Sequence, residues 1–188
     1  MRAGTASARP AAVLFDRDGT LVVDVPYNGD PDLVQPVPGA REALDRLRSA
    51  GVPTALVSNQ SGIARGLLTR DQVDAVNARL EELVGPLGPV FVCEHGPEDG
   101  CGCRKPAPGM VLAAADALGV DPADCVVIED SAAGIASGLA AGVAVLGVPA
   151  LQAVAPAPGL TLRDGLAGVD VAELEDVLAA GDLSESIA

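Results

Sequence analysis

Short runs of valine, leucine and alanine alternate with helical patterns along the whole chain. The apolar runs lack the polar alternation of a half-exposed strand, which is typical of strands buried on both faces of a parallel sheet. We expect strands at 11–15, 52–57, 88–93, 125–128 and 143–148, and helices at 39–50, 69–84, 108–118, 132–141 and 171–180. This alternation predicts an α/β fold of three layers, with helices on both sides of the sheet.

The length of 188 residues fits one domain. We expect that domain to span residues 11–180, with a flexible N-terminal tail over 1–10 and a C-terminal tail over 181–188. No apolar run reaches the roughly 18 residues of a membrane span, so we expect no membrane contact. The first ten residues lack the apolar segment of a signal peptide, which favours a cytoplasmic location.

The formal net charge of −14 argues against nucleic-acid binding, because no basic stripe is available to neutralise phosphates. A small anionic ligand would be repelled by the protein as a whole and would need a local positive pocket. Arg17, Arg65, Arg104 and Lys105 are candidates to form it.

The only histidine, the only lysine and three of the four cysteines lie within residues 93–105. Cys93, His95, Cys101 and Cys103 offer three thiolates and one imidazole, a set that fills a tetrahedral structural zinc site. Soft sulfur ligands favour zinc over magnesium or calcium. The alternative is a redox thiol group or a set of ordinary buried cysteines. A zinc site here would fix the loop that carries Arg104 and Lys105. We therefore expect Lys105 to be a functional cation held in place, although most lysines are solvated on the protein surface.

Polar and charged residues follow four of the predicted strands. In a parallel sheet of this kind, ligands bind at the carboxyl ends of the strands. We therefore expect one crevice that gathers Asp16 and Asp18, Ser58 and Asn59, Arg104 and Lys105, and Glu129 and Asp130.

Asp16 and Asp18 come directly after the first strand and can share one hard cation while differing in role. Asp16 is a candidate nucleophile and Asp18 a candidate proton donor and acceptor. Asp18-Gly19 would also suit a hairpin turn, but a long loop containing Pro and Gly follows instead of a clear paired strand.

The run Asp16-Arg-Asp-Gly-Thr20 resembles the first motif of the haloacid dehalogenase (HAD) superfamily of phosphohydrolases. Ser58, Lys105 and the pair Glu129-Asp130 match the other three motifs in order. The resemblance covers about residues 11–180 and implies a Rossmann-like phosphatase. It implies catalysis by Asp16, Asp18, Ser58 and Lys105, and Mg²⁺ bound by Asp16, Asp18 and Asp130, with Glu129 as a further candidate. Residues 21–57 leave no room for a cap domain.

Three segments are similar to the D-glycero-D-manno-heptose 1,7-bisphosphate phosphatases and the related histidinol-phosphate phosphatases. They are the zinc loop, residues 58–66 and residues 104–110. The resemblance implies a structural Zn²⁺, a small phosphorylated sugar as substrate, and a monomer or homodimer. It assigns substrate contacts to Arg17, Asp24, Tyr27, Ser58, Asn59, Gln60, Ser61, Arg104, Lys105 and Ser131.

The fourth motif departs from the heptose family, which usually has a basic residue where this chain has Ser131. The run Ile128-Glu-Asp-Ser131 looks more like the β-phosphoglucomutase branch. A phosphomutase is therefore one alternative, although mutases of that branch need a helical cap to keep water out. A non-catalytic zinc module that binds another protein is the second, although all four catalytic positions are chemically competent.

Overall fold

The computed structural model describes residues 9–148 and 154–181. Most of the two predicted tails lies outside these ranges. Six parallel strands form one sheet in the order β3-β2-β1-β4-β5-β6. The strands are β1 (Ala12–Phe15), β2 (Thr54–Asn59), β3 (Val90–Cys93), β4 (Cys125–Glu129), β5 (Ala144–Gly147) and β6 (Leu160–Leu162).

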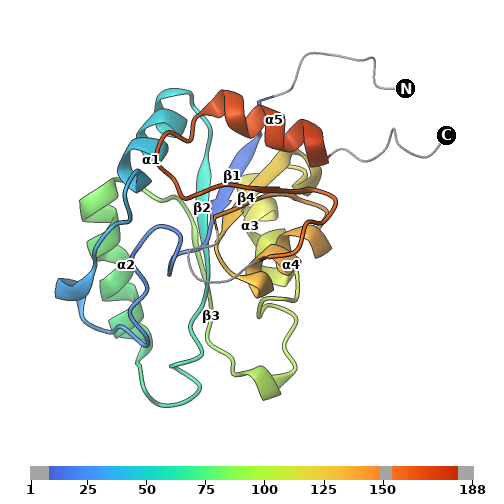
Figure 1. Ribbon diagram of the computed structural model, residues 1–188. Coiled ribbons are helices and arrows are strands. Elements are labelled where there is room, and N and C mark those ends of the chain that lie inside the picture. Colours follow the sequence, from blue (N-terminus) through green and yellow to red (C-terminus); the bar gives the residue numbers. More distant parts are fainter. Residues whose placement is uncertain (1–8, 149–153, 182–188) are drawn as a thin grey trace.

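Helices cover both faces of the sheet (Figure 1). Their bounds are α1 (Ala40–Ser49), α2 (Arg70–Val84), α3 (Gly109–Leu118), α4 (Ala132–Ala140) and α5 (Val171–Gly181), with short 3₁₀ turns at η1 (Pro31–Leu33), η2 (Pro97–Asp99) and η3 (Pro122–Asp124). The predicted three-layer α/β fold is confirmed.

Two apolar cores lie on opposite faces of the sheet, because successive side chains of a strand point to opposite sides. Val13 and Phe15 of β1 pack with apolar side chains of α1, α2 and α5. Ala12 and Leu14 pack with those of α3 and α4. All four β1 side chains are therefore buried, which explains why this strand shows no polar alternation.

The predicted elements agree with the observed ones to within two residues at each end. The main displacement is β2, which begins and ends two residues later than expected and so includes Ser58 and Asn59. The prediction missed β6, whose three residues Leu160–Leu162 are too few to show a pattern. Between β1 and β2 the chain forms only loops, η1 and α1.

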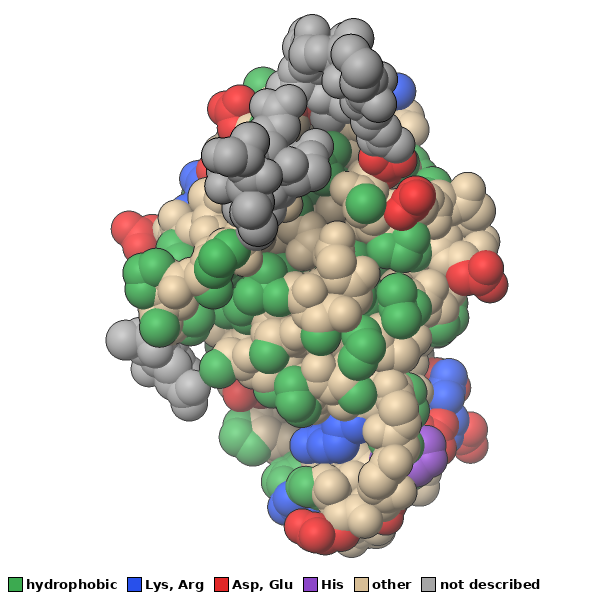
Figure 2. Space-filling model, turned by 90° about the vertical axis from the view of Figure 1, so that its right-hand side faces the viewer, with side chains coloured by type: hydrophobic (Ala, Val, Ile, Leu, Met, Phe, Trp, Pro, Cys, Tyr) green, Lys and Arg blue, Asp and Glu red, His purple; other side chains and the backbone are tan. Residues whose placement is uncertain are grey.

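The outer surface of α4 carries no charge, since its sequence is Ala-Ala-Gly-Ile-Ala-Ser-Gly-Leu-Ala. The face of the molecule in Figure 2 is correspondingly apolar or uncharged in its middle, with charged side chains toward its margins. Among the described helices, none has the length and hydropathy needed to cross a membrane.

Gly88 lies so close to the backbone of Thr54 that no larger residue fits at this position. It has φ +79°, and a Cβ there would lie 2.1 Å from the carbonyl oxygen of Thr54 at the start of β2. We predict that Gly88→Ala lowers the free energy of unfolding by about 2 kcal/mol or more, since both the backbone conformation and the contact become unfavourable.

Gly51, just beyond α1, provides the matched control. It has φ +69°, but nothing lies within 4 Å of a Cβ placed there. Gly51→Ala should therefore cost about 1 kcal/mol, the conformational part alone. Urea unfolding followed by circular dichroism measures both variants, and equal losses would contradict the role given to the contact with Thr54.

Candidate active site

The carboxyl ends of β1, β2 and β4 bring buried polar side chains together. Asp16 follows β1, Ser58 lies near the end of β2, and Glu129 is the last residue of β4. All three are buried, as is Lys105 from the loop after β3. Because neighbouring parallel strands end at the same edge, side chains more than 100 residues apart in sequence meet here.

Lys105 is held by two carboxylates. Its Nζ lies 2.6 Å from Oδ1 of Asp16 and 2.6 Å from Oε1 of Glu129. Burial alone would lower the pKa of Lys105, but the two carboxylates raise it above its ordinary value. The ammonium therefore stays charged and ties the loop after β3 to the ends of β1 and β4.

Glu129 is fixed by the start of α4. Its Oε2 accepts hydrogen bonds from the backbone N–H and the hydroxyl of Ser131, at 2.8 and 2.9 Å. Ser131 is also the N-cap of α4, because its hydroxyl accepts from Gly134 N. A Cβ at Gly134 would lie 1.6 Å from Oε1 of Glu129, so only glycine leaves room for this carboxylate.

Asp16, Glu129 and Asp130 form a carboxylate group whose ligand oxygens lie within 4.8 Å of one another. Burial raises the pKa of Asp16 well above its ordinary value, although Lys105 opposes the effect, and burial with Glu129 raises that of Asp130 to about 6. Three carboxylates thus face one ammonium, which leaves an excess of negative charge. Oxygen ligands and uncompensated negative charge suit a magnesium ion.

Asp18 does not belong to this carboxylate group. Its Oδ1 accepts from Nε of Arg17 at 3.0 Å, and its Oδ2 accepts from a terminal nitrogen of Arg17 at 3.0 Å and from Nε2 of Gln60 at 2.7 Å. The carboxylates brought together are therefore those of Asp16, Glu129 and Asp130, rather than the expected set of Asp16, Asp18 and Asp130.

Asn59 and Gln60, at the end of β2, position other site residues. The side-chain amide of Asn59 donates to the carbonyl of Lys105 and accepts from its N–H, at 3.2 and 3.1 Å. Nε2 of Gln60 bridges Asp18 and the hydroxyl of Ser58, the latter at 2.9 Å. Asn59 thus ties the end of β2 to Lys105, and Gln60 ties Ser58 to Asp18 in the loop after β1.

A cavity of about 170 Å³ opens beside Asp18. Six of the predicted substrate residues line it: Arg17, Asp24, Tyr27, Asn59, Gln60 and Ser61. Burial and the charge of Asp18 raise the pKa of Asp24. The remaining predicted substrate residues, Ser58, Arg104, Lys105 and Ser131, are not among the lining residues.

Three further residues line the pocket. Val25 belongs to the loop 24–27, which the resemblance also assigns to the pocket, whereas Asn28 and Gly62 were not expected to line it. Arg65 donates to the hydroxyl of Tyr27 at 2.8 Å and lies over its ring. The sequence indicates Arg65 as a candidate positive charge, but it does not indicate a contact with Tyr27, which lies 38 residues away.

Cys93, His95, Cys101 and Cys103 lie together at the end of β3 and in the loop that follows it. Sulfur–sulfur distances range from 3.3 to 3.8 Å, and Nδ1 of His95 lies 3.6 Å from Cys93 and 3.4 Å from Cys103. Ligands of a tetrahedral zinc ion stand roughly 3.5–3.8 Å apart, given zinc–sulfur bonds of about 2.3 Å. Burial raises the pKa of the Cys93 thiol to about 12, so a thiolate there requires a neighbouring positive charge.

Arg104 follows the cysteine cluster directly. A terminal nitrogen of its guanidinium donates to the carbonyl oxygen of His95 at 3.2 Å, so the side chain lies across the same loop. This contact ties Arg104 to the cluster rather than to the 170 Å³ cavity.

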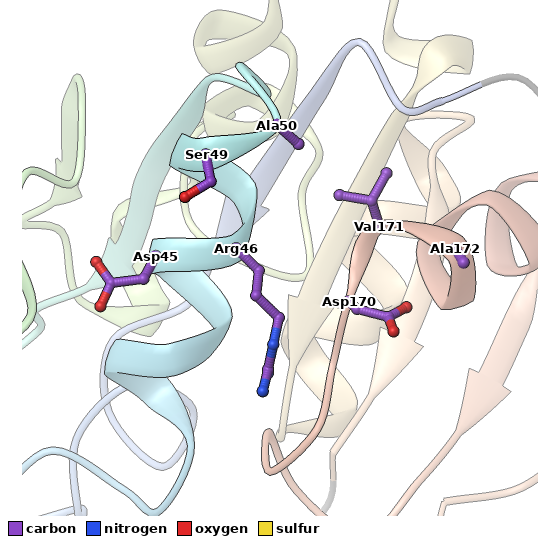
Figure 3. Close-up of a pocket in the computed structure, with 7 residues that line it drawn as sticks. All are labelled: Asp45, Arg46, Ser49, Ala50, Asp170, Val171 and Ala172. Carbon is purple, nitrogen blue, oxygen red and sulfur yellow. The ribbon is translucent and has the colours of Figure 1, made fainter.

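A larger hollow of about 570 Å³ lies between α1 and α5 (Figure 3). It is lined by Asp45, Arg46, Ser49, Ala50, Asp170, Val171 and Ala172. Ala50 precedes β2, which places this hollow at the amino ends of the strands, away from Asp16 and Lys105. Arg46 donates to the carbonyl oxygen of Val169, and Asp45 forms an ion pair with Arg48. These two charged side chains of the hollow are therefore already bonded within the protein.

Comparison with known proteins agrees with this geometry. The profile of haloacid dehalogenase-like hydrolases matches residues 26–142. A D-glycero-beta-D-manno-heptose-1,7-bisphosphate 7-phosphatase of Pseudomonas aeruginosa is 42% identical over 124 residues, covering 63% of this chain and 70% of that protein.

Two solved structures of D,D-heptose 1,7-bisphosphate phosphatases are also similar. The enzyme from B. bronchiseptica, complexed with magnesium and phosphate, gives a TM-score of 0.76 at 31% identity, covering 88% of this chain and 99% of that one. The enzyme from Burkholderia thailandensis gives 0.60 at 25% identity, covering 88% and 97%.

The chain belongs to the haloacid dehalogenase-like hydrolases. Within them it is a phosphatase.

The Lys105 contacts lead to a prediction about stability. Lys105→Met leaves the buried carboxylates of Asp16 and Glu129 without their cation, and breaking a buried ion pair in this way costs about 3–5 kcal/mol. We expect a loss of that size in the free energy of unfolding. Circular dichroism is the suitable probe, because the chain has no tryptophan.

The adjacent residue supplies the control. Arg104→Met removes a partly exposed cation whose one side-chain hydrogen bond within the described residues goes to the carbonyl oxygen of His95. Its cost should stay near 1 kcal/mol or below. A similar loss in the two variants would show that the ion pairs of Lys105 contribute little.

Proposed function

We propose that this protein is a magnesium-dependent phosphatase of a small phosphorylated sugar and works through a phosphorylated Asp16. The observation that carries the proposal is the position of Asp16. Its carboxylate is buried at the end of β1, bonded to Lys105, in a carboxylate group next to a polar cavity.

Asp16 is the proposed nucleophile. Lys105 engages Oδ1, which leaves Oδ2 to form the bond to phosphorus as the bond to the sugar oxygen breaks. In this proposal Lys105 and the hydroxyl of Ser58 bind the oxygens of the transferring phosphoryl group. Fixed donors of this kind supply most of the catalysis in phosphoryl transfer.

Asp18 is the proposed proton carrier. It gives a proton to the departing sugar oxygen, and then takes one from the water that attacks the phosphorylated Asp16. Water oxygen bonds to phosphorus, the bond to Asp16 breaks, and inorganic phosphate leaves. The position of Asp18 at the cavity, outside the carboxylate group, is consistent with a role toward the substrate.

Asp16, Glu129 and Asp130 are the side chains that would hold magnesium, and the ion would supply positive charge for the phosphoryl oxygens when bound. A close contact supports the fit, because a Cβ at Gly19 would lie 2.2 Å from Oδ2 of Asp130. Thr20 orients the same carboxylate by donating to its Oδ1 at 3.2 Å. Asp18 is a further candidate magnesium ligand, which the sequence resemblance implies but the carboxylate group of the structure does not contain.

The four Cys and His side chains would hold a structural zinc ion. Four protein ligands fill a tetrahedral shell, so the ion would serve the loop and not the reaction. The two cations Arg104 and Lys105 follow Cys103 directly, so the metal would set where their side chains begin. Four unpaired thiols also support a reducing cytoplasmic location.

The substrate we propose is D-glycero-D-manno-heptose 1,7-bisphosphate, cleaved at the C7 phosphate. The name of the relative from P. aeruginosa supports this choice. Histidinol phosphate is the alternative. Ser131 does not favour either substrate, because its hydroxyl is used by Glu129 and Gly134.

A panel of phosphorylated metabolites tests the substrate. We expect the highest kcat/KM, from phosphate release with added Mg²⁺, for the heptose bisphosphate, with the C1 phosphate retained. Hexose monophosphates and histidinol phosphate should be slower. A clear preference for histidinol phosphate would reject the heptose assignment.

We predict that Asp16→Asn folds normally but loses turnover by a thousandfold or more, as for removal of other essential groups. An amide can neither attack phosphorus nor balance the charge of a metal. Asp116→Asn, the same chemical change on an exposed residue of α3, should keep full activity. Near-normal phosphate release by the folded Asp16 variant would sink the nucleophile assignment.

Metal analysis tests the zinc proposal. Purified protein should contain about one zinc per chain, and Cys101→Ser or strong chelation should remove it and lower Tm, because metal binding contributes to folding. Cys125→Ala should keep the zinc, because Cys125 lies outside the cluster. An active protein with no zinc and four reactive thiols would show the proposal to be wrong.

A further inference from the structure

Asn77 is an exception on the buried face of α2. The other buried residues of this helix are Val73, Val76, Leu80 and Val84. The Nδ2 group of Asn77 is buried and has no hydrogen-bond partner among the described residues. An unpaired buried amide destabilises a fold, so an apolar side chain would suit this position better. Packing alone therefore does not explain the asparagine.

The contact of Asn77 with Arg17 explains its orientation. Oδ1 of Asn77 accepts a hydrogen bond from a terminal nitrogen of Arg17 at 3.0 Å. A guanidinium can only donate, so the amide oxygen must face it and the NH₂ group must point elsewhere. The unpaired NH₂ is thus a consequence of bonding Arg17.

Among the described residues, Arg17 is the largest side chain that is fully buried, with 1% of it exposed. Its Nε and one terminal nitrogen hold both oxygens of Asp18, and the other terminal nitrogen holds Asn77. A planar guanidinium with two-point contact fixes both the position and the plane of a carboxylate. The third contact ties that plane to α2, a 15-residue helix.

We propose that Asn77, acting through Arg17, is a positioning residue that fixes the carboxylate of Asp18 for proton transfer. The inference rests on the role proposed above for Asp18. Asp18 lines the cavity, and its side chain is 27% exposed. Because one side of the carboxylate faces open space, its orientation depends on the hydrogen bonds that it accepts from the protein. Proton transfer depends steeply on geometry, and small displacements reduce rates strongly.

A purely structural role is the competing explanation, and two substrates separate the two. Glycerol 2-phosphate releases an alkoxide that needs a proton, whereas p-nitrophenyl phosphate releases a stable phenolate. Misplacing Asp18 should therefore slow the first substrate more than the second. A general loss of structure would slow both alike.

Asn77→Leu is the decisive variant. It removes the unpaired NH₂ of Asn77 but leaves a buried N–H of Arg17 without its acceptor, so Tm should fall modestly while the protein stays folded. We expect kcat to fall about tenfold on glycerol 2-phosphate and about twofold on p-nitrophenyl phosphate. Asn77→Asp keeps an acceptor oxygen for Arg17 and should therefore retain most of the kcat on both substrates. Val76→Ala, the neighbouring buried position, should lower Tm and leave the ratio of the two rates unchanged.

Two further variants make the outcome unambiguous. In an Asp18→Asn background, Asn77→Leu should cause no additional loss, because both changes act on one step. Arg17→Lys keeps the buried charge but removes the two-point contact, and should show the same selective loss. If Asn77→Leu does not fold, equal losses on both substrates in Arg17→Lys would still overturn the inference, because Asn77 is proposed to act only through the contact of Arg17 with Asp18.

An unchanged ratio of rates in folded Asn77→Leu, or a full additional loss in the Asp18→Asn background, would overturn the inference. If Asp18→Asn itself affects both substrates equally, the proposed role of Asp18 fails instead. The two failures are therefore distinguishable.

Discussion

The ammonium of Lys105 lies between the carboxylates of Asp16 and Glu129, and the arrangement of the site depends on these contacts. They join the ends of β1 and β4 to the loop after β3 in one buried cluster. Burial of charge is costly unless each group is paired, so the cation and the carboxylates require one another. The amide of Asn59 holds the backbone of the same lysine from β2, which fixes where the ammonium can reach.

The carboxylates at the end of β1 differ in their surroundings. Asp16, Glu129 and Asp130 share one small volume, where burial and mutual repulsion favour a bound cation. Asp18, only two residues beyond Asp16, is turned toward Arg17 and Gln60 and faces the cavity. One strand end therefore supplies two carboxylates with different partners, which suits a phosphatase that needs both a nucleophile and a proton carrier.

The sequence predicted much of this arrangement, because the periodicity of strands and helices and the positions of polar residues after strands are local features. The helices from α1 to α5 were expected, as was a crevice at the strand ends. The cluster of Cys93, His95, Cys101 and Cys103 was visible in sequence because scarce residue types lie close together. The strand β6 was missed because three residues carry no recognisable period.

By itself, therefore, the sequence determined the class of fold, the set of reactive groups and the strand ends at which they gather. Only the tertiary structure decided which group contacts which. It placed Glu129 against Lys105 and Ser131, and it paired Asp18 with Arg17 and Gln60. It also placed Asn77, from a helix distant in the sequence, against Arg17. The physical reason is that side-chain pairing depends on how segments distant in the sequence pack together. The periodicity of a strand or helix, in contrast, depends only on neighbouring residues and can be recognised from the sequence.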